Sequence, residues 1–322
     1  MDKTPRNTTG DKEALLSNVA LLYYGEGLTQ GEIAKRLKVS RATVVNMLRE
    51  SRDLGIVEIR VDGRHLSGST LSRDLREAFG LEDVYVADLG EGTEIDRAQT
   101  LKQVGRVAAT ALLDTAEPGN RIGIAWGETI LAVAEATPQN PVQGVEVCQL
   151  IGSMISERVP ASEDCTIQIA AKLGAQCFTL HAPGLISDAS LAAKIRLEPT
   201  INAQLQRLKS LDLCVYSIGN VAPETHLAAA GMATEDELTA ARAQGAVGIV
   251  CCRYIDAQGH DIDLPPTNRV IAAQTQDLRA AKKKLLVVCG VDRRDAALAA
   301  LRGDLVTHLC VDSALAKAML QV

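Results

Sequence analysis

The first sixty residues carry apolar patterns with helical spacing. Between residues 11 and 24, apolar side chains recur every three or four positions, which predicts a helix with one apolar face. Thr29, followed three positions later by Glu32, forms a capping-box pattern ahead of a second, short helix. After a tight turn, Ser40 is placed to cap another helix, which Gly55 ends. The pattern therefore predicts two short helices joined by a tight turn and preceded by a longer helix.

The rest of the chain alternates apolar runs with helical segments. Residues 56–61 alternate apolar with charged side chains and predict a wing-like strand, and the polar residues 63–68 predict a linker. Beyond them we expect strands within 83–89, 121–126, 145–152, 177–183, 211–219, 246–252, 284–290 and 308–312, and helices over 71–80, 97–114, 128–136, 163–173, 199–209, 235–243, 294–302 and 313–320. Apolar runs without alternation suit strands buried on both faces. The sequence therefore predicts an all-α domain over 1–62 and an α/β domain with a mostly parallel open sheet over 63–322.

Composition narrows the function classes. The 322 residues are 47% hydrophobic and 23% charged, which is ordinary globular composition. With two Phe, five Tyr and one Trp, platforms that stack the bases of single strands are not expected. Neither a signal-like leader nor an apolar run of membrane-spanning length is found, so we expect a cytoplasmic protein.

The charge is unevenly distributed along the chain. The net charge of −6 argues mildly against a nucleic-acid partner when the chain is taken whole. Residues 1–62 carry ten basic and nine acidic side chains, a net of +1, so the remaining residues carry −7. Residues 35–52 contain six basic side chains and one acidic side chain, which gives a local charge of +5. A phosphate backbone responds to that local field.

Two short helices joined by a tight turn, the second basic at its start, form a helix-turn-helix pattern. The side chains at the start of the second helix would enter the major groove, where Arg41 suits guanine and Asn46 suits adenine. The alternative is a three-helix packing module that binds no DNA. The candidate DNA-binding residues are Thr29, Gln30, Lys38, Ser40, Arg41, Ala42, Thr43, Val45, Asn46 and Arg49.

The segment LLYYGEGLTQGEIAKRLKVSRATVVNMLRESRDLGIVEI resembles the N-terminal signature of the SorC family of bacterial sugar-responsive transcriptional regulators. Later motifs keep the family's order: GIAWGET, LCVYSIG, GAVGIVCCRYIDAQG and VVCGVDRRDAALAALRG. The resemblance implies regulation of a carbohydrate catabolic operon by a small sugar, sugar-phosphate or polyol effector. It also implies homotetramers, and an α/β domain similar to sugar-phosphate isomerase and deaminase folds.

Glycine-containing turns after predicted strands are candidates for binding the effector, because ligands of open parallel sheets lie beyond the carboxyl ends of the strands. Backbone N–H groups at such turns can cradle phosphate, and guanidinium groups can hold an anion bidentately. The candidates are Gly127, Glu128, Thr129, Gly152, Gly219, Asn220, Gly290, Arg293 and Arg294.

Departures from the family pattern bear on the effector. The family usually has the motif Gly-Gly-x-x-Lys at the positions of residues 290–294. In this chain Val291 replaces the second glycine and Arg294 replaces the lysine. Relatives commonly carry an acidic residue that binds sugar hydroxyls where this chain has Ile249. The resemblance therefore implies an effector site with one hydroxyl acceptor fewer than usual.

Other chemistry is less favoured by the sequence. An alternative function is a sugar-phosphate isomerase or deaminase with an appended DNA-binding arm, for which Glu128 is a weak candidate base. A weaker hypothesis is redox sensing through Cys251 and Cys252 or Cys289, although adjacent cysteines on a strand would point to opposite faces. The spacing of cysteines and histidines predicts no metal site, and we expect no cofactor.

Overall fold

The structure is a computed structural model that describes residues 8–57, 69–88, 96–154, 162–223 and 225–321. Contacts divide the chain into two compact units, Met1–Val61 and Asp62–Val322. The expected linker at 63–68 lies outside the described residues, as does all but the first two positions of the expected strand over 56–61.

The small unit consists of helices whose starts are fixed by side chains. Helix α1 (Thr8–Ala20) continues into a π-helical turn, η1 (Leu21–Gly25), and is followed by α2 (Gln30–Leu37) and α3 (Arg41–Asp53). The capping box predicted at Thr29 and Glu32 is confirmed, because each accepts a hydrogen bond from the backbone N–H of the other. The Ser40 cap of α3 is confirmed as well. Buried Val19, Leu22, Ile33, Ala34, Val44 and Leu48 form the core of this unit.

The large unit is built on one seven-stranded sheet in which every pairing is parallel. Its order is β1 (Asp83–Ala87), β10 (His308–Asp312), β9 (Lys283–Val288), β5 (Leu213–Tyr216), β2 (Arg121–Ile124), β3 (Glu146–Gln149) and β4 (Gln176–Phe178). The central strands are buried along nearly their whole length, as expected for apolar runs without alternation. The predicted mostly parallel open sheet is confirmed.

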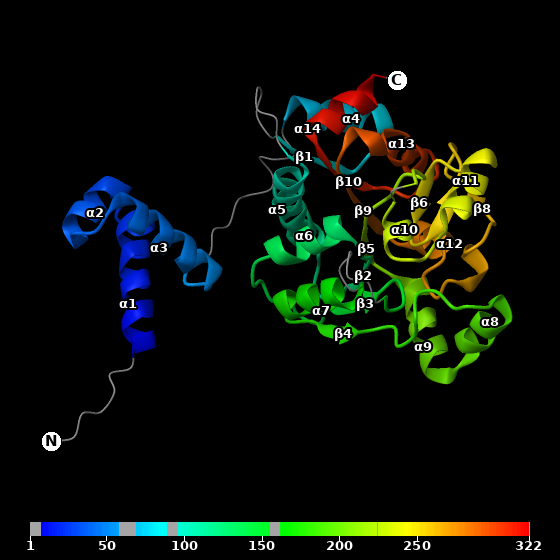
Figure 1. The fold of residues 1–322 in the computed structure, drawn as a ribbon, viewed down its shortest axis with the longest axis horizontal. Helices are drawn as coiled ribbons and strands as arrows, with labels where there is room; N and C mark the ends of the chain where they lie inside the picture. Colours follow the sequence, from blue (N-terminus) through cyan, green and yellow to red (C-terminus); the bar gives the residue numbers. More distant parts are fainter. Residues whose placement is uncertain (1–7, 58–68, 89–95, 155–161, 224, 322) are drawn as a thin grey trace. The chain divides into compact units, whose positions relative to one another are not determined.

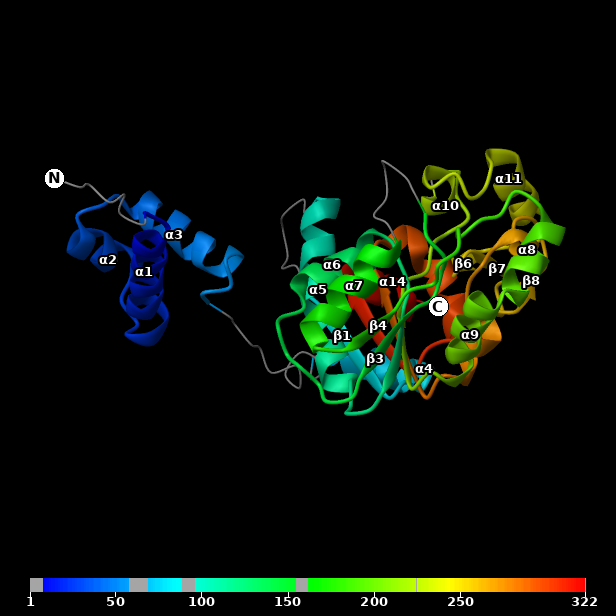
Figure 2. The ribbon, with the colours of Figure 1, turned by 90° about the horizontal axis from the view of Figure 1, so that it is seen from below.

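Helices cover both faces of this sheet (Figures 1 and 2). Helices α5 (Arg97–Thr115), α6 (Glu128–Ala136) and α7 (Ser162–Leu173) pack along one face, and α4 (Thr70–Phe79), α13 (Arg294–Arg302) and α14 (Ser313–Leu320) pack on the other. Within the described residues, no helix combines the length and the apolar character needed to cross a membrane.

The apolar run over 246–252 does not join the main sheet, which corrects the expectation. It forms β6 (Gly248–Val250), which pairs antiparallel with β7 (Arg253–Ile255), and β7 pairs in turn with β8 (Asp261–Ile262). Three further elements were not predicted as separate units: α8 (Ala189–Leu197), α10 (His226–Ala229) and α12 (Thr275–Ala280). The remaining elements are α9 (Pro199–Arg207), α11 (Glu235–Ala243) and the short 3₁₀ turns η3 (Leu208–Ser210), η4 (Thr267–Arg269) and η5 (Val291–Arg293).

The order of the strands fixes where a ligand can enter. From β2 the chain proceeds outward to β3 and β4, whereas from β5 it proceeds in the opposite direction to β9 and β10. The loops that leave the carboxyl ends of β2 and β5 therefore diverge, and they open a crevice between these two neighbouring strands.

Candidate functional site

A cavity lies at this crevice. The space within it is about 540 Å³ when the open solvent at its mouth is counted. Segments that follow β2, β3, β5 and β9 line it together with the β6–β7 hairpin. The lining residues are Ala125, Trp126, Gly127, Thr129, Ile151, Ser217, Ile218, Gly219, Thr225, Ile249, Cys251, Cys252 and Arg293.

The turn after β2 presents backbone N–H groups to the cavity. Gly127 precedes α6 with φ +113°, a conformation that favours glycine, and no side chain caps this helix. The N–H groups of the first helical turn are therefore suited to an anion, as is the helix dipole. Thr129 is buried in that turn and lines the cavity.

Arg293 brings a positive charge to the cavity. Gly290, at φ +95°, and the 3₁₀ turn η5 fold the chain back after β9, and the Arg293 side chain is only 7% exposed. One guanidinium nitrogen donates to the Cys289 carbonyl oxygen at 2.7 Å. Among the described residues, no carboxylate forms an ion pair with it. A buried cation without a counter-ion is costly, so an anionic ligand would be stabilised here.

The other candidate effector residues do not line the cavity. Arg294 was expected to hold the effector, but its guanidinium donates to the carbonyl oxygens of Ala318 and Gln321 at the end of α14. Glu128 pairs with Arg97 at 3.1 Å, and the Asn220 amide donates to the Asp292 carboxylate at 2.9 Å.

The two remaining glycine candidates serve the backbone around the cavity. The Gly290 N–H donates to the Asp312 carboxylate at 2.7 Å. Gly152 has no room for a side chain, since an added Cβ would lie 2.5 Å from the Ala182 carbonyl oxygen. Of the nine candidates, Gly127, Thr129, Gly219 and Arg293 line the cavity.

Cys251 and Cys252 occupy a turn and not a strand, so the expectation of opposite strand faces does not apply. They connect β6 to β7 and have φ values of +46° and +62°. Burial raises the pKa of both thiols, to about 12 for Cys252. Neutral thiols are weak nucleophiles, so this environment does not favour redox sensing.

Sequence reasoning missed several lining residues. Trp126 directly precedes the glycine turn that was singled out, and Ser217 and Ile218 directly precede Gly219, so extending each motif by one or two positions would have found them. Ile151 likewise directly precedes the candidate Gly152. Thr225 carries no local signal, because tertiary packing alone brings it to the cavity.

The ten candidate DNA-binding residues lie on α2, on the turn and on α3 of the small unit. Gln30 and Thr43 are partly buried and the other eight are exposed. Lys38 ends α2 in the left-handed conformation with φ +55°, which turns the chain toward α3. The residues of α3 that face the core are Val44, Leu48 and Ser51.

Two hydrogen bonds hold polar side chains on the exposed face of α3. The Arg41 guanidinium donates to the Gln30 side-chain oxygen at 3.3 Å, which links α3 to the start of α2. The Arg49 guanidinium donates to the Asn46 side-chain oxygen one turn away. The Thr43 hydroxyl lies 2.8 Å from the Ser40 hydroxyl, at the start of α3.

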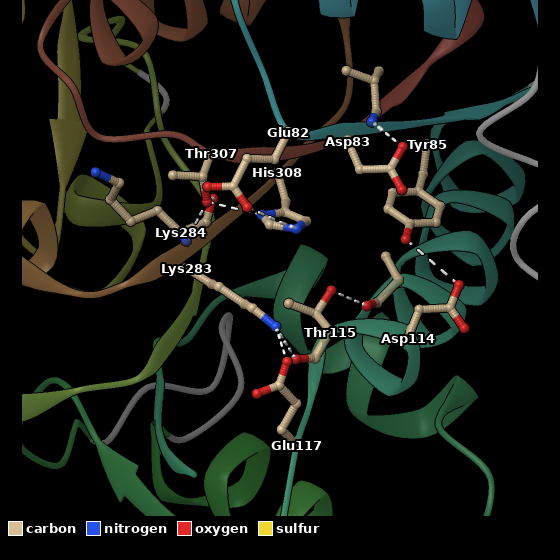
Figure 3. Close-up of polar contacts among 12 residues, drawn as sticks. Glu82, Asp83, Tyr85, Asp114, Thr115, Glu117, Lys283, Lys284, Thr307 and His308 are labelled. Atoms are coloured by element: carbon tan, nitrogen blue, oxygen red, sulfur yellow. Dashed lines mark hydrogen bonds and ion pairs between the residues drawn. The ribbon is translucent and has the colours of Figure 1, made fainter.

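A separate polar cluster lies at the amino ends of β1, β9 and β10, away from the cavity. Figure 3 shows Lys283 reaching the Glu117 carboxylate and the Thr115 carbonyl oxygen, at 2.6 and 3.1 Å. His308 lies beside Thr307 at 2.8 Å and beside Glu82 at 3.8 Å, and burial lowers its pKa. These contacts tie strand ends to neighbouring loops, and none of the candidate residues lies among them.

Comparisons with known proteins agree over nearly the whole chain. Residues 65–321 match the family described as "Putative sugar-binding domain". The "Uncharacterized transcriptional regulator YjhU" of Escherichia coli (strain K12) is 30% identical over 99% of this chain and 98% of its own length. The deoxyribonucleoside regulator of Bacillus subtilis (strain 168) is 28% identical over 96% of this chain and 98% of its own.

A solved structure supports the same fold. The full-length sorbitol operon regulator SorC from Klebsiella pneumoniae matches with a TM-score of 0.70 and 24% identity, covering 96% of this chain and 99% of that one. These proteins are named as transcriptional, deoxyribonucleoside and sorbitol operon regulators, and the matching family is described as a sugar-binding domain.

Proposed function

The chain belongs to the SorC family of transcriptional regulators with a sugar-binding domain, and from this premise we propose that it binds operator DNA through α3 and responds to a small carbohydrate bound in the cavity. The regulated genes would be those of a carbohydrate catabolic operon, and the protein would act in the cytoplasm. The observation that carries the effector part is Arg293, a buried cation that faces a cavity at the switch point of the sheet.

The DNA-binding part rests on the exposed face of α3. With α2 and the turn at Lys38, it has the dimensions of a helix-turn-helix, whose second helix fits the major groove. Arg41 and Asn46 would contact base edges, while Lys38 and Arg49 would contact phosphates. The side chains of Thr29, Gln30, Ser40 and Thr43 would set the position of α3, since each is engaged in caps or inter-helix bonds.

The effector part rests on the polar end of the cavity. Arg293, the N–H groups after Gly127 and the Thr129 hydroxyl would together hold a phosphate or carboxylate group. An anionic sugar would therefore bind more tightly than a free sugar or polyol of the same size. Self-association into dimers or tetramers would present two copies of α3 to a pseudo-palindromic operator.

The proposal is tested by electrophoretic mobility shift on the DNA upstream of the protein's own gene, with a random duplex of the same length as competitor. We expect binding that survives an excess of random DNA at moderate salt, because base contacts add to the phosphate contacts. Equal competition by the random duplex would contradict the DNA-binding part.

The effector part has its own test in a thermal-shift screen of sugar phosphates, sugar acids, free sugars and polyols. A ligand that binds the folded protein raises its apparent melting temperature. We expect stabilisation by an anionic sugar, and a screen in which only neutral sugars stabilise the protein would contradict the role given to Arg293.

A further inference from the structure

One wall of the cavity is formed by aliphatic and thiol side chains, whereas a sugar site usually has hydrogen-bond acceptors. Ile249, Cys251 and Cys252 line this wall from the β6–β7 hairpin, and each is at most 6% exposed. The sulfur of Cys252 lies 3.7 Å from that of Met232, and Trp126 lies beside it. Among the described residues that line the cavity, none has a carboxylate or amide side chain.

The tip of the β6–β7 hairpin has a strained backbone, because two non-glycine residues adopt positive φ there. Val250 pairs with Arg253, so Cys251 and Cys252 form a two-residue turn with positive φ at both positions. Asn-Gly or Gly-Gly would adopt this turn with less strain. Strained non-glycine positions persist where the side chains serve a site. Both cysteine side chains are buried at the cavity, so the turn supplies them to its wall.

The cavity also has a charged part of its lining. Arg293 and Thr129 both neighbour Cys289, which follows β9, and Gly127 lies two residues before Thr129. The hairpin wall instead neighbours Trp126 and Met232. The cavity lining therefore combines a cation and a helix start with an apolar wall.

We propose that Ile249, Cys251 and Cys252 determine effector specificity by selecting an anionic sugar derivative that has a deoxygenated carbon facing this wall. The inference rests on the proposed function and specifies its ligand class. A hydroxyl group in contact with Ile249 would lose its hydrogen bonds to water and gain no partner, whereas a CH₂ or CH₃ group packs well on aliphatic carbon and polarisable sulfur.

The test compares sugars that differ by one hydroxyl group. Suitable pairs are 2-deoxyribose 5-phosphate with ribose 5-phosphate, 2-deoxyglucose 6-phosphate with glucose 6-phosphate, and 2-keto-3-deoxygluconate with 2-ketogluconate. Trp126 is the only tryptophan of the chain and lines the cavity, so its fluorescence reports binding directly. We expect the tightest-binding compound to be a deoxy member that exceeds its partner roughly tenfold to a hundredfold. A hydroxylated compound that binds tightest, or as tightly as its partner, would overturn the inference.

Matched variants locate the selectivity on the wall. The backbone N–H and C=O of Ile249 are both bonded to Gly219, at 2.8 and 3.0 Å, so exchanging its side chain leaves this frame in place. Ile249→Asn adds a hydroxyl partner and is expected to reduce the preference for the deoxy compound about tenfold, whereas Ile249→Val keeps it. Cys252→Ser, which exchanges a thiol for a hydroxyl of similar shape, is expected to reduce the preference in the same direction.

The outcomes separate this inference from the function on which it rests. If both Ile249→Asn and Cys252→Ser kept the wild-type preference for the deoxy compound, the hairpin would not determine specificity. The proposed effector site would be unaffected by that result. If no compound of the panel bound and none changed DNA binding, the proposed effector function would itself be contradicted, and this inference with it.

Discussion

Two consecutive arginines have different surroundings, and only the first of them lines the cavity. Arg293 ends the 3₁₀ turn η5 and its side chain is buried at the cavity, whereas Arg294 begins α13 and donates to the end of α14. A glycine turn followed by Arg-Arg predicted an anion site, and the structure places Arg293, but not Arg294, at the cavity. Which arginine lies at the cavity could not be predicted from the sequence. It depends on how the chain turns within η5, which is only three residues long.

Arg293→Met is therefore expected to weaken binding of an anionic effector by at least about tenfold, because a charge-assisted hydrogen bond contributes about 1.5–3 kcal/mol. Fluorescence titration of Trp126 measures the loss, and the affinity for DNA without effector is expected to stay unchanged. Arg294→Met is the matched control, with effector affinity close to wild type. Equal losses in the two variants would show that Arg293 has no special role.

On the small unit, Arg41→Ala is expected to weaken operator binding by about 1–3 kcal/mol and to weaken binding to random duplexes less. The reason is that a base contact is lost only on the operator. Arg36→Ala is the control, since Arg36 is equally cationic but lies 3.8 Å from Glu26, near the end of α1. Equal losses on operator and random DNA would make Arg41 a phosphate contact.

At the scale of elements, local side-chain chemistry was easier to predict than tertiary placement. The caps at Thr29 and Ser40 and the alternation of strands and helices could be predicted because they depend on residues a few positions apart. The run over 246–252 looks like any buried strand, and its separation from the main sheet depends on the turn at Cys251 and Cys252. Cysteine carries no turn signal, so the β6–β7 hairpin was not predicted.

The cap of α3 gives a test at this scale. Ser40→Ala is expected to destabilise the start of α3 by about 1 kcal/mol, because the Thr43 N–H loses its acceptor. Hydrogen-exchange mass spectrometry of the peptide that covers α3 should show faster exchange, and Ser40→Thr should restore protection. Unchanged exchange in Ser40→Ala would mean that the cap contributes nothing measurable.

The amino edge of the sheet gives a pH test. Burial lowers the pKa of His308, with Glu82, Asp83 and Lys283 as the charged groups around it. Because the unfolded chain binds a proton at a higher pH than the folded chain, the contribution of His308 to stability is present above pH about 6.5 and is lost as the pH falls. When the pH is lowered from 7.5 to 5.5, the melting temperature of His308→Gln is expected to fall less than that of wild type. An identical pH dependence would contradict this.

At the scale of the whole molecule, the two units differ in charge as well as in proposed role. The small unit carries a +5 stretch over residues 35–52, and the residues after 62 carry −7. An acidic effector unit would be repelled by DNA, which leaves α3 as the surface that binds. An effector can alter DNA affinity only if it binds the two states of the protein differently, and the coupling must be reciprocal. Operator DNA should therefore change effector affinity by the same factor.

The most direct test is a titration of the upstream DNA with protein at a fixed, moderate salt concentration, with and without a saturating anionic sugar found in the screen. We expect the sugar to change operator affinity about tenfold or more in wild-type protein and to leave affinity for the random duplex unchanged, and we expect Arg293→Met to abolish the change. An operator affinity that no bound sugar alters would contradict the proposal that the cavity controls DNA binding.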